Sequence, residues 1–312
     1  MTIERAVPVD GVLLVAKPAG QTSFDVVRRV KKLLPRTKVG HTGTLDPMAT
    51  GLLPLTVGEA TKLTRWLSSG DKRYRARLQL GTATDSLDAT GQPLERAAVP
   101  RLDAAVVAAA LEPFRGAIDQ VPPMYSAVHH RGQRLYALAR QGIEVERQPR
   151  PVTIHRLELV ALEPTALELD VLCSSGTYIR SLADAIARAL GTVGHLSALE
   201  RTEVCGWHLE RARPAETLDR ASALGSLLSL EQVLTRFARI DVTAGIARRL
   251  ANGQRLERAD LERLGVAAAD EPRTVWFMPP DAAPIVLAEL APAGAEPAMH
   301  ILRVLRPPRA GG

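Results

Sequence analysis

The sequence predicts an α+β protein with a small β-rich appendage at its C-terminal end. Short apolar segments of strand character alternate with amphipathic helical segments over roughly the first 210 residues. Beyond that point Ala, Pro and Gly become frequent, and the expected strands are short. With 312 residues, the chain is long enough for two domains or for one large domain with an appendage.

The chain opens with a strand and a capped helix. Residues 11–16 are apolar, as in a buried strand. Thr22 or Ser23 can cap a helix whose apolar residues form one stripe through about Leu34. Pro35 then stops the helix, because proline lacks the N–H that the next turn would need.

Two more strands and a helix are predicted before residue 81. A short strand covers 52–57, and a helix covers 59–67. Residues 72–80 alternate between two faces, as in a strand with one buried side. Tyr74 falls on the apolar face and is expected to be at least partly buried. The opposite face is basic and compatible with contact to a polyanion, with Arg73, Arg75 and Arg77 on it.

The later elements follow the same alternation. They are predicted as a helix at 103–111, strands at 152–160 and 166–173, a helix at 178–190 ending at Gly191, a helical stretch at 214–235, and strands at 274–278, 285–290 and 300–305. Between the first two of these, Pro122-Pro123 opens an irregular basic stretch that is expected to form a loop–helix hairpin.

Composition excludes several classes of protein. No apolar run approaches the roughly 18 residues of a membrane span, and the first ten residues lack a secretion signal, so a cytoplasmic location is expected. Cys173 and Cys205 are too few for a disulfide framework and are expected to be reduced thiols. His129 and His130 have no third ligand nearby, so no metal is expected.

The distribution of charge permits a polyanionic partner. The net charge is +6, and all six lysines lie in the first 72 residues. Residues 1–80 hold fourteen basic and six acidic side chains, a net charge of +8, and the remainder is near −2. A phosphate backbone would be attracted to such a basic half, but ordinary solvated surface charge fits these numbers equally well.

The most informative segment is the loop at 40–51, GHTGTLDPMATG. It places one carboxylate, Asp46, among glycines that permit positive φ or a close backbone approach. Pro47 restricts the backbone of Asp46, and three threonine hydroxyls can bond nearby backbone groups. Such a loop can hold a catalytic carboxylate in one pose. On composition alone, an ordinary Asp-Pro turn is the more frequent explanation.

Further motifs accompany this loop. In chain order they are GVLLVAKP at 11–18, DKRY at 71–74, segments at 126–128, 132–136 and 139–145, CSSGTYIR at 173–180, and a segment at 194–199 that begins GHL and ends at Leu199. With the loop, they occur over about residues 10–205 in an order and spacing that resemble the TruB-type tRNA pseudouridine synthases. The combination is far more specific than any one motif.

The resemblance implies the fold in more detail. A pseudouridine synthase fold is a mixed, largely antiparallel sheet with flanking helices and a cleft across it. The catalytic domain would occupy residues 1–236, with an RNA-binding insertion at about 121–148. A PUA-like C-terminal domain, expected to be barrel-like, would occupy 237–312. The alternation of short strands and helices agrees with this fold without specifying it.

The implied activity is the isomerisation of uridine to pseudouridine at position 55 in the T-loop of tRNA. Uracil leaves C1′ through N1 and reattaches through C5. The reaction needs a nucleophile, a group that moves the C5 proton, and a pocket for the detached base. The resemblance assigns the nucleophile to Asp46 and pairs it with Arg180, because a guanidinium keeps a buried carboxylate ionised and oriented. It places Tyr74 against the base, where a ring can stack and a phenol can relay a proton.

The resemblance also assigns residues that bind the substrate. The target uridine must be flipped out of its stack, and His41 would fill the vacated place. Tyr178 would contact the substrate from the start of its helix, and Leu199 would line the base pocket. Lys17 would support the loop more than it touches the reacting atoms. Three arginines of the insertion would hold the RNA: Arg131, Arg134 and Arg140.

The expected partner is tRNA, with no cofactor, no metal and no obligatory protein partner, and the chain is expected to be a monomer.

One position departs from the family pattern. Glu200 stands where many relatives carry a basic residue, and it would either weaken RNA contact locally or face Arg201.

Other functions stay open at this point. A tRNA-binding or folding chaperone would work without catalysis by Asp46, and a guide-RNA-dependent relative would need partner proteins. A glycoside hydrolase needs a second carboxylate at a defined separation, for which Asp85 and Asp88 stand near a turn. Taken without the resemblance, Tyr178 and Arg180 fit a core aromatic residue and a surface arginine at a helix start.

Overall fold

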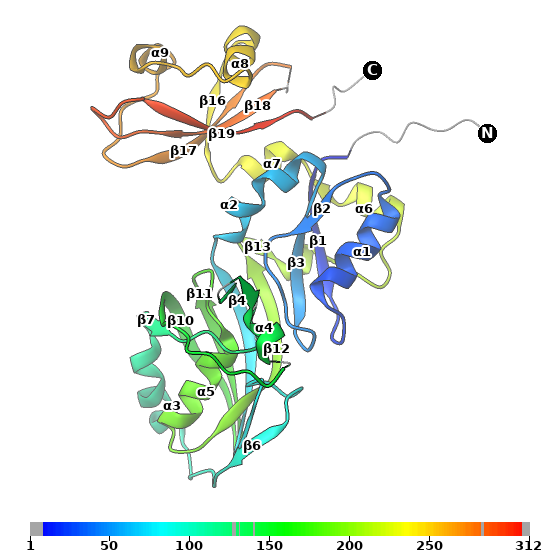
Figure 1. Ribbon diagram of the computed structural model, residues 1–312, viewed down its shortest axis with the longest axis vertical. Coiled ribbons are helices and arrows are strands. Elements are labelled where there is room, and N and C mark those ends of the chain that lie inside the picture. Colours follow the sequence, from blue (N-terminus) through cyan, green and yellow to red (C-terminus); the bar gives the residue numbers. More distant parts are fainter. Residues whose placement is uncertain (1–8, 127–128, 131, 140, 282–283, 308–312) are drawn as a thin grey trace, which may run out of the picture.

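The fold consists of two large, separate sheets and their helices. The structure is a computed structural model that describes residues 9–126, 129–130, 132–139, 141–281 and 284–307. The first sheet has eleven strands and lies in the body of the molecule (Figure 1). The second has four strands and is built by the C-terminal part of the chain. The α+β class predicted from the sequence is confirmed.

The larger sheet is mixed and largely antiparallel, as predicted. Its main path runs in the order β14-β1-β3-β12-β4-β11-β10-β7. Among the described pairs, β1 with β14 and β3 with β12 are parallel, and the others are antiparallel. The strands are β1 Gly11–Lys17, β2 Val39–His41, β3 Thr50–Val57, β4 Lys72–Leu80, β7 Gly116–Gln120, β10 Arg150–Glu163, β11 Ala166–Cys173, β12 Gly194–Val204, β13 Trp207–His208, β14 Arg213–Pro214 and β15 Leu227–Leu228.

Helices and short ribbons complete this part of the fold. They are α1 Ser23–Leu33, the 3₁₀ helix η1 Gly58–Leu63, α2 Thr64–Ser68, β5 Thr82–Thr84, β6 Pro93–Arg96, α3 Ala104–Leu111, η2 Glu112–Phe114, β8 His129–His130, β9 Gln133–Arg134, α4 Leu135–Ala139, α5 Ile179–Ala189, η3 Leu209–Arg211, α6 Arg220–Gly225 and α7 Leu230–Leu234. Helices α3 and α5 lie together on one face of the sheet, against β10 and β12 (Figure 1).

Helix α1 shows how local sequence sets an element. The Thr22 hydroxyl accepts a hydrogen bond from the Asp25 N–H at 3.1 Å, and the Asp25 carboxylate accepts one from the Thr22 N–H at 3.0 Å. This capping box satisfies two backbone donors that the first helical turn leaves free. The buried stripe includes Val26 and Val30, so the predicted cap and apolar face are both confirmed.

Several elements differ from the prediction. The helix expected at 59–67 begins as the 3₁₀ helix η1 and becomes α-helical only at Thr64. The helical stretch expected at 214–235 is broken into α6 and α7, because β15 lies between them and pairs with β1. Strands β7 and β12 were not expected. The charged residues of β12 hid its alternation, although it crosses the middle of the sheet.

The junction of β3 and β12 requires a glycine. At this parallel contact Arg201 lies beside Gly51, which has φ +101°. A Cβ at Gly51 would stand 2.3 Å from the Arg201 carbonyl oxygen, so no side chain fits there. Gly51 therefore lets the end of the 40–51 loop meet the middle of β12, and this contact brings two distant segments of the sequence together.

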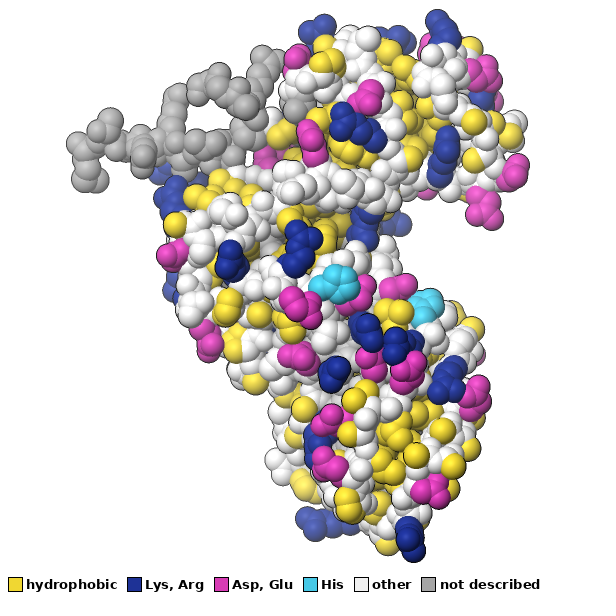
Figure 2. Space-filling model, turned by 180° about the vertical axis from the view of Figure 1, so that it is seen from behind, with side chains coloured by type: hydrophobic (Ala, Val, Ile, Leu, Met, Phe, Trp, Pro, Cys, Tyr) yellow, Lys and Arg dark blue, Asp and Glu magenta, His cyan; other side chains and the backbone are white. Residues whose placement is uncertain are grey.

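The outer face of the sheet is charged but neutralised by ion pairs. Arg73 bonds Asp170 at 2.7 Å, and Arg77 bonds Glu163 at 2.6 Å. Arg75 lies opposite Asp170 in the register. Basic and acidic side chains are interspersed over the body in the view from behind (Figure 2). Two of the three arginines on the face predicted to be basic, Arg73 and Arg77, are thus paired with acids from neighbouring strands.

The C-terminal part forms a small β-sheet domain, as predicted. Its elements are β16 Ala238–Asp241, α8 Ala244–Ala251, α9 Arg258–Arg263, β17 Arg273–Met278, β18 Ile285–Leu290 and β19 Met299–Leu305. The described strands form an open sheet in the order β16-β17-β18-β19, not the barrel-like one expected. Two helices, α8 and α9, pack their apolar residues on one face. Within the described part of the chain, no helix combines the length and apolar character that a membrane crossing needs.

The C-terminal sheet is joined to the body by an apolar cluster. Its other face packs Trp276 and Leu287 against Leu63 of η1 and Val12 of β1. The cation–π contact of Arg303 with Trp66, 5.3 Å from guanidinium carbon to ring centre, lies at the same junction. The C-terminal domain therefore rests on the segment that leads from β3 into β4.

Candidate active site

A cleft of about 840 Å³ opens across the sheet at the 40–51 loop. Five of the site residues predicted from the sequence line it together: Asp46, Tyr74, Tyr178, Arg180 and Leu199. They come from the loop after β2, from β4, from the start of α5 and from β12. The predicted constellation is therefore assembled in one place, although its members are up to 153 residues apart in the sequence.

The loop that carries Asp46 is held by side chains from other elements. The Ser23 hydroxyl accepts from the Leu45 N–H at 2.8 Å and donates to the Leu45 carbonyl at 3.2 Å. The Gly20 N–H donates to the Pro47 carbonyl at 2.8 Å. The residues on both sides of Asp46 are thus fixed by α1 and its preceding turn, and the loop has little freedom to move its carboxylate.

Arg180 is the centre of the polar network in the cleft. Its Nε donates to Asp46 Oδ2 at 2.8 Å, and its Nη2 donates to Asp46 Oδ1 at 3.3 Å. The same guanidinium donates to the carbonyl of Ser86 at 2.9 Å and to that of Tyr125 at 2.8 Å. Asp88 lies near, with 3.7 Å between its Oδ2 and Arg180 Nε. The Arg180 side chain is 4% exposed, whereas that of Asp46 is 33% exposed, so the carboxylate keeps an open side.

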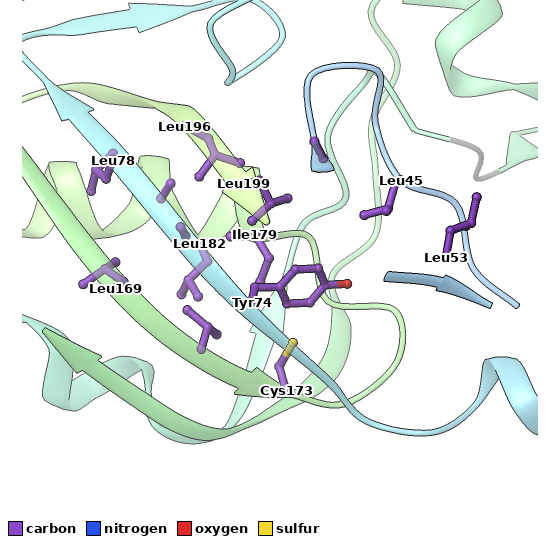
Figure 3. Packing of buried hydrophobic residues seen from close by; sticks show 14 of the residues in the cluster. Leu45, Leu53, Tyr74, Leu78, Leu169, Cys173, Ile179, Leu182, Leu196 and Leu199 are labelled. Atoms are coloured by element: carbon purple, nitrogen blue, oxygen red, sulfur yellow. The ribbon is translucent and has the colours of Figure 1, made fainter. Parts of the chain in front are cut away.

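Tyr74 projects from β4 toward the loop. Its ring extends from the apolar cluster that contains Leu169 and Leu182, and its hydroxyl points toward the side of Leu45 (Figure 3). Burial raises the pKa of the Tyr74 phenol, and the nearby Arg201 guanidinium opposes that rise. The phenol is therefore protonated at neutral pH and can donate a hydrogen bond within the cleft.

Tyr178 and Leu199 complete the lining. The Tyr178 N–H donates to Gln120 Oε1 at 2.7 Å, and Gln120 Nε2 donates back to the Tyr178 carbonyl at 3.1 Å. These two hydrogen bonds from Gln120, at the end of β7, fix the backbone where α5 begins, two residues before Arg180. Leu199 is 7% exposed and lies beside Tyr74 and Ile179 (Figure 3).

Lys17 and His41 lie outside the lining of the cleft. The Lys17 ammonium lies under the loop and donates to the carbonyls of Pro18 at 2.8 Å, Gln21 at 2.7 Å and Pro47 at 3.3 Å. Its position fits the expected support of the loop and gives no direct path to a substrate. Burial lowers the pKa of Lys17 to about 8. His41 ends β2, and burial followed by the charge of Arg201 lowers the pKa of its imidazole, which keeps the ring neutral.

The three arginines predicted to hold RNA are not placed at the cleft by the structure. Arg131 and Arg140 lie outside the described residues, and the side chain of Arg134 does too. Glu200 lies opposite Arg75 in the register and alternates with the buried Arg201, so the two side chains point to opposite faces of β12. The alternative that Glu200 faces Arg201 is therefore wrong.

Arg201 is a residue of the cleft that the sequence analysis did not assign to the site. Its side chain is 1% exposed and donates to three carbonyls, those of Leu52 at 2.8 Å, Thr44 at 3.4 Å and Gly43 at 3.0 Å. It thus ties the loop to β12 and lines the cleft beside Tyr74. Recognising 194–204 as a strand would have placed Arg201 on the same face as Leu199.

The acids Asp85 and Asp88 have structural partners. Asp88 Oδ1 accepts from the Ser86 hydroxyl at 2.8 Å and the Thr90 hydroxyl at 2.6 Å. Asp85 Oδ1 accepts from the Gln92 N–H at 2.8 Å. Among the described residues, no group of three or more His, Cys, Asp or Glu side chains is placed to hold a metal ion.

Comparison with known proteins identifies the family. Residues 31–179 match the family model described as TruB family pseudouridylate synthase, N-terminal domain. The tRNA pseudouridine synthase B of Chromohalobacter salexigens is 45% identical over 274 residues, which cover 86% of this chain and 88% of the relative. The chain belongs to the TruB family of pseudouridine synthases. It is therefore an isomerase, and the glycoside hydrolase alternative is excluded.

Other relatives agree with this family. The tRNA pseudouridine synthase B of Nitrosococcus oceani is 46% identical over 252 residues, which cover 79% of this chain and 82% of the relative. A crystal structure of a Cbf5-Nop10-Gar1 complex has a TM-score of 0.71 at 22% sequence identity, and the match covers 98% of this chain and 88% of that one. At that identity the likeness shows a shared fold, which extends into the C-terminal β-sheet domain.

Proposed function

We propose that the chain isomerises uridine to pseudouridine at position 55 in the T-loop of tRNA, with Asp46 as the nucleophile. The observation that carries this proposal is the Asp46–Arg180 pair, held in an open cleft with a buried tyrosine beside it. Two relatives named tRNA pseudouridine synthase B support tRNA as the substrate. The resemblance of the 40–51 loop supports the position in the T-loop.

The proposed chemistry uses the open side of the Asp46 carboxylate. The carboxylate attacks the nucleotide, the bond from C1′ to N1 breaks, and the uracil turns before C5 bonds to C1′. The bond that Asp46 formed to the nucleotide breaks as the product is completed, which restores the carboxylate. The proton on C5 leaves, and one is added to N1, so that atoms and charge balance without a redox partner. Arg180 keeps the carboxylate ionised and limits its rotation through two hydrogen bonds. Attack at C1′, attack at C6 of the base and assistance to elimination all fit this geometry.

The detached base must stay in the cleft while it turns. Tyr74 and Leu199, both 7% exposed, form an apolar floor on which uracil can lie. The protonated Tyr74 phenol lies where it can donate to the base and relay the C5 proton. Tyr178 contributes from the rim of the cleft at the start of α5.

Entry of the uridine requires base flipping. A base stacked in the T-loop cannot reach a carboxylate inside a cleft, and unstacking costs a few kcal/mol. A neutral His41 ring next to the cleft can fill the vacated stack, since it needs no desolvation of a charge. In this proposal Arg131, Arg134 and Arg140 of the insertion hold the RNA backbone.

The proposal includes the organisation of the chain. A catalytic domain at 1–236, with its insertion at about 121–148, is followed by a PUA-like domain at 237–312. The chain acts in the cytoplasm as a monomer, without a cofactor or an obligatory protein partner. The side chains of Ser23 and Arg201, which hold the loop through hydrogen bonds, both belong to this chain, and this favours activity of the purified protein alone.

The test is pseudouridine formation in an unmodified tRNA transcript, mapped by position, with the purified chain and its Asp46→Ala variant and no added cofactor. Modification of the T-loop uridine by the wild type alone is the expected result. Tight tRNA binding without product would favour the folding chaperone or a partner-dependent enzyme. Product at another position would overturn the proposed site of modification.

A further inference from the structure

Ser126 carries a buried hydroxyl in the lining of the cleft. The residue is 5% exposed, and its Oγ is buried with no hydrogen-bond partner among the described residues. Its backbone is held on both sides: the Ser126 N–H donates to the Met124 carbonyl at 2.9 Å, and its carbonyl accepts from the Tyr136 N–H at 3.1 Å. A buried hydroxyl is normally hydrogen-bonded, so this one lacks a partner that the described part of the chain does not supply.

Four other described hydroxyls of the cleft already have hydrogen-bond partners. Ser86 and Thr90 donate to Asp88, Thr177 donates to the Ser174 carbonyl at 3.0 Å, and Ser68 donates to a carbonyl at 2.6 Å. Those groups stabilise the fold of the cleft wall. Ser126 differs from them because its donor and acceptor capacity is free for a ligand.

The position of Ser126 is fixed relative to Asp46. The carbonyl of the preceding residue, Tyr125, accepts from Arg180 Nη2 at 2.8 Å. The same nitrogen donates to Asp46 Oδ1 at 3.3 Å. One guanidinium therefore fixes the positions of both the proposed nucleophile and the segment that carries Ser126. A ligand atom bonded to Ser126 would be held at a fixed position relative to Asp46.

The depth of the cleft indicates which part of a nucleotide Ser126 meets. Tyr74 of β4 and Leu199 and Arg201 of β12 belong to the sheet across which the cleft opens, so they form its floor. Ser126 comes from the insertion, together with Tyr136, which is 37% exposed at the rim. A flipped nucleotide enters base first, since its sugar and phosphates stay joined to the RNA. The base then faces the floor, and the ribose and phosphates face the insertion side.

We propose that the Ser126 hydroxyl hydrogen-bonds the ribose–phosphate of the flipped target nucleotide and so positions C1′ against Asp46. This inference rests on the proposed function. The partner oxygen is either the ribose 2′-hydroxyl or a flanking phosphate oxygen, which share the chemistry of a hydrogen-bond acceptor in the sugar–phosphate backbone.

The test compares Ser126→Ala with the wild type on three RNA stem-loops. One is unmodified, one has 2′-deoxyuridine at the target, and one has a methylphosphonate flanking the target. On unmodified RNA, Ser126→Ala should lower kcat/KM about tenfold, the effect of one substrate hydrogen bond. On the analogue that lacks the partner oxygen, the substitution should change kcat/KM less than twofold. The analogue on which Ser126→Ala no longer lowers kcat/KM identifies the partner oxygen.

A stability measurement separates this role from a structural one. Because Ser126 Oγ has no hydrogen-bond partner in the part of the chain that the structure describes, the melting temperature of Ser126→Ala should equal or exceed that of the wild type. Ser86→Ala is the matched control: it removes a hydroxyl that bonds Asp88 at 2.8 Å, and its melting temperature should fall. A lowered melting temperature of Ser126→Ala would indicate a structural hydroxyl and overturn the inference.

Two further outcomes are decisive. If the wild type makes pseudouridine but Ser126→Ala keeps kcat/KM within twofold on unmodified RNA, the inference fails and the proposed function stands. An equal tenfold loss on all three RNAs would also overturn it, because the lost contact would then lie elsewhere. If the wild type forms no pseudouridine in any RNA, the proposed function falls and this inference falls with it.

Discussion

Arg180 and Asp46 form a two-point ion pair, with 2.8 Å from Nε to Oδ2 and 3.3 Å from Nη2 to Oδ1. The arginine is buried and belongs to α5, whereas the aspartate is partly open and belongs to the loop after β2. The guanidinium also holds the carbonyls of Ser86 and Tyr125. One side chain thus joins three walls of the cleft around a single carboxylate, and four predictions follow from this arrangement and its surroundings.

Asp46→Asn should abolish turnover and leave tRNA affinity within about tenfold. The amide is nearly the same shape but is not a nucleophile, and one Arg180 bond can remain to its oxygen. Single-turnover assays and filter binding check both parts. Asp85→Asn is the matched control, because Asp85 also lines the cleft but bonds the Gln92 N–H, and its rate should stay within tenfold. Lost tRNA binding by Asp46→Asn would point to a structural role.

Arg180→Met should lower the rate by at least about a hundredfold and destabilise the protein by about 3 kcal/mol. The variant leaves the Asp46 carboxylate without its partner and two buried carbonyls without a donor. Single-turnover kinetics and urea unfolding measure the two effects. A control is Arg188→Met on the exposed side of the same helix, where little change is expected. A near-normal rate of Arg180→Met would show that the ion pair does not act in catalysis.

Replacing Arg131, Arg134 and Arg140 together with Gln should weaken tRNA binding and flatten its salt dependence. Each lost phosphate contact should reduce the slope of log K against log salt by about 0.9. Binding isotherms between low and physiological salt provide the slope. Arg77→Gln is the control, since Arg77 is paired with Glu163 on the outer face. An unchanged slope in the triple variant would remove the insertion from the RNA interface.

Lys17 should make stability depend on pH above neutrality. Burial lowers its pKa in the folded protein to about 8, from the ordinary 10.5. Between these values the unfolded chain binds more protons than the folded one, so the free energy of unfolding should rise with pH. The contribution is roughly 1 kcal/mol per pH unit in the middle of the window. The cost of the buried charge is present in full below pH 8 and disappears above about pH 10.5.

Urea unfolding at pH 8, 9 and 10 tests this prediction. The rise with pH should be smaller in Lys17→Met than in the wild type, because burial also lowers the pKa of Lys72 and this second lysine keeps part of the rise. Lys38→Met, which removes an exposed lysine, is the matched control and should keep the rise. Parallel pH profiles for the wild type and Lys17→Met would contradict the assigned burial of the charge.

Local sequence was sufficient for much of the fold. Strand β1, the capping box of α1 and the alternation of β4 are short-range patterns, and the structure confirms them. Strand β12 was missed because its alternation includes charged residues on both faces, one of them the fully buried Arg201. Only neighbouring carbonyls make such a burial acceptable, and these come from distant parts of the chain.

By itself, the sequence determined the family, the class of reaction and the segment that carries Asp46, because the motifs and their order can be read directly from the linear sequence. Tertiary structure decided which side chains meet. Gly51 allows β3 to touch β12, and this contact brings Arg201 beneath the loop. It also decided that Arg73 and Arg77 are neutralised by acids, and that the Ser126 hydroxyl is buried away from any partner among the residues that the structure describes. These are long-range contacts, and a linear pattern carries no information about which remote group will lie beside a given atom.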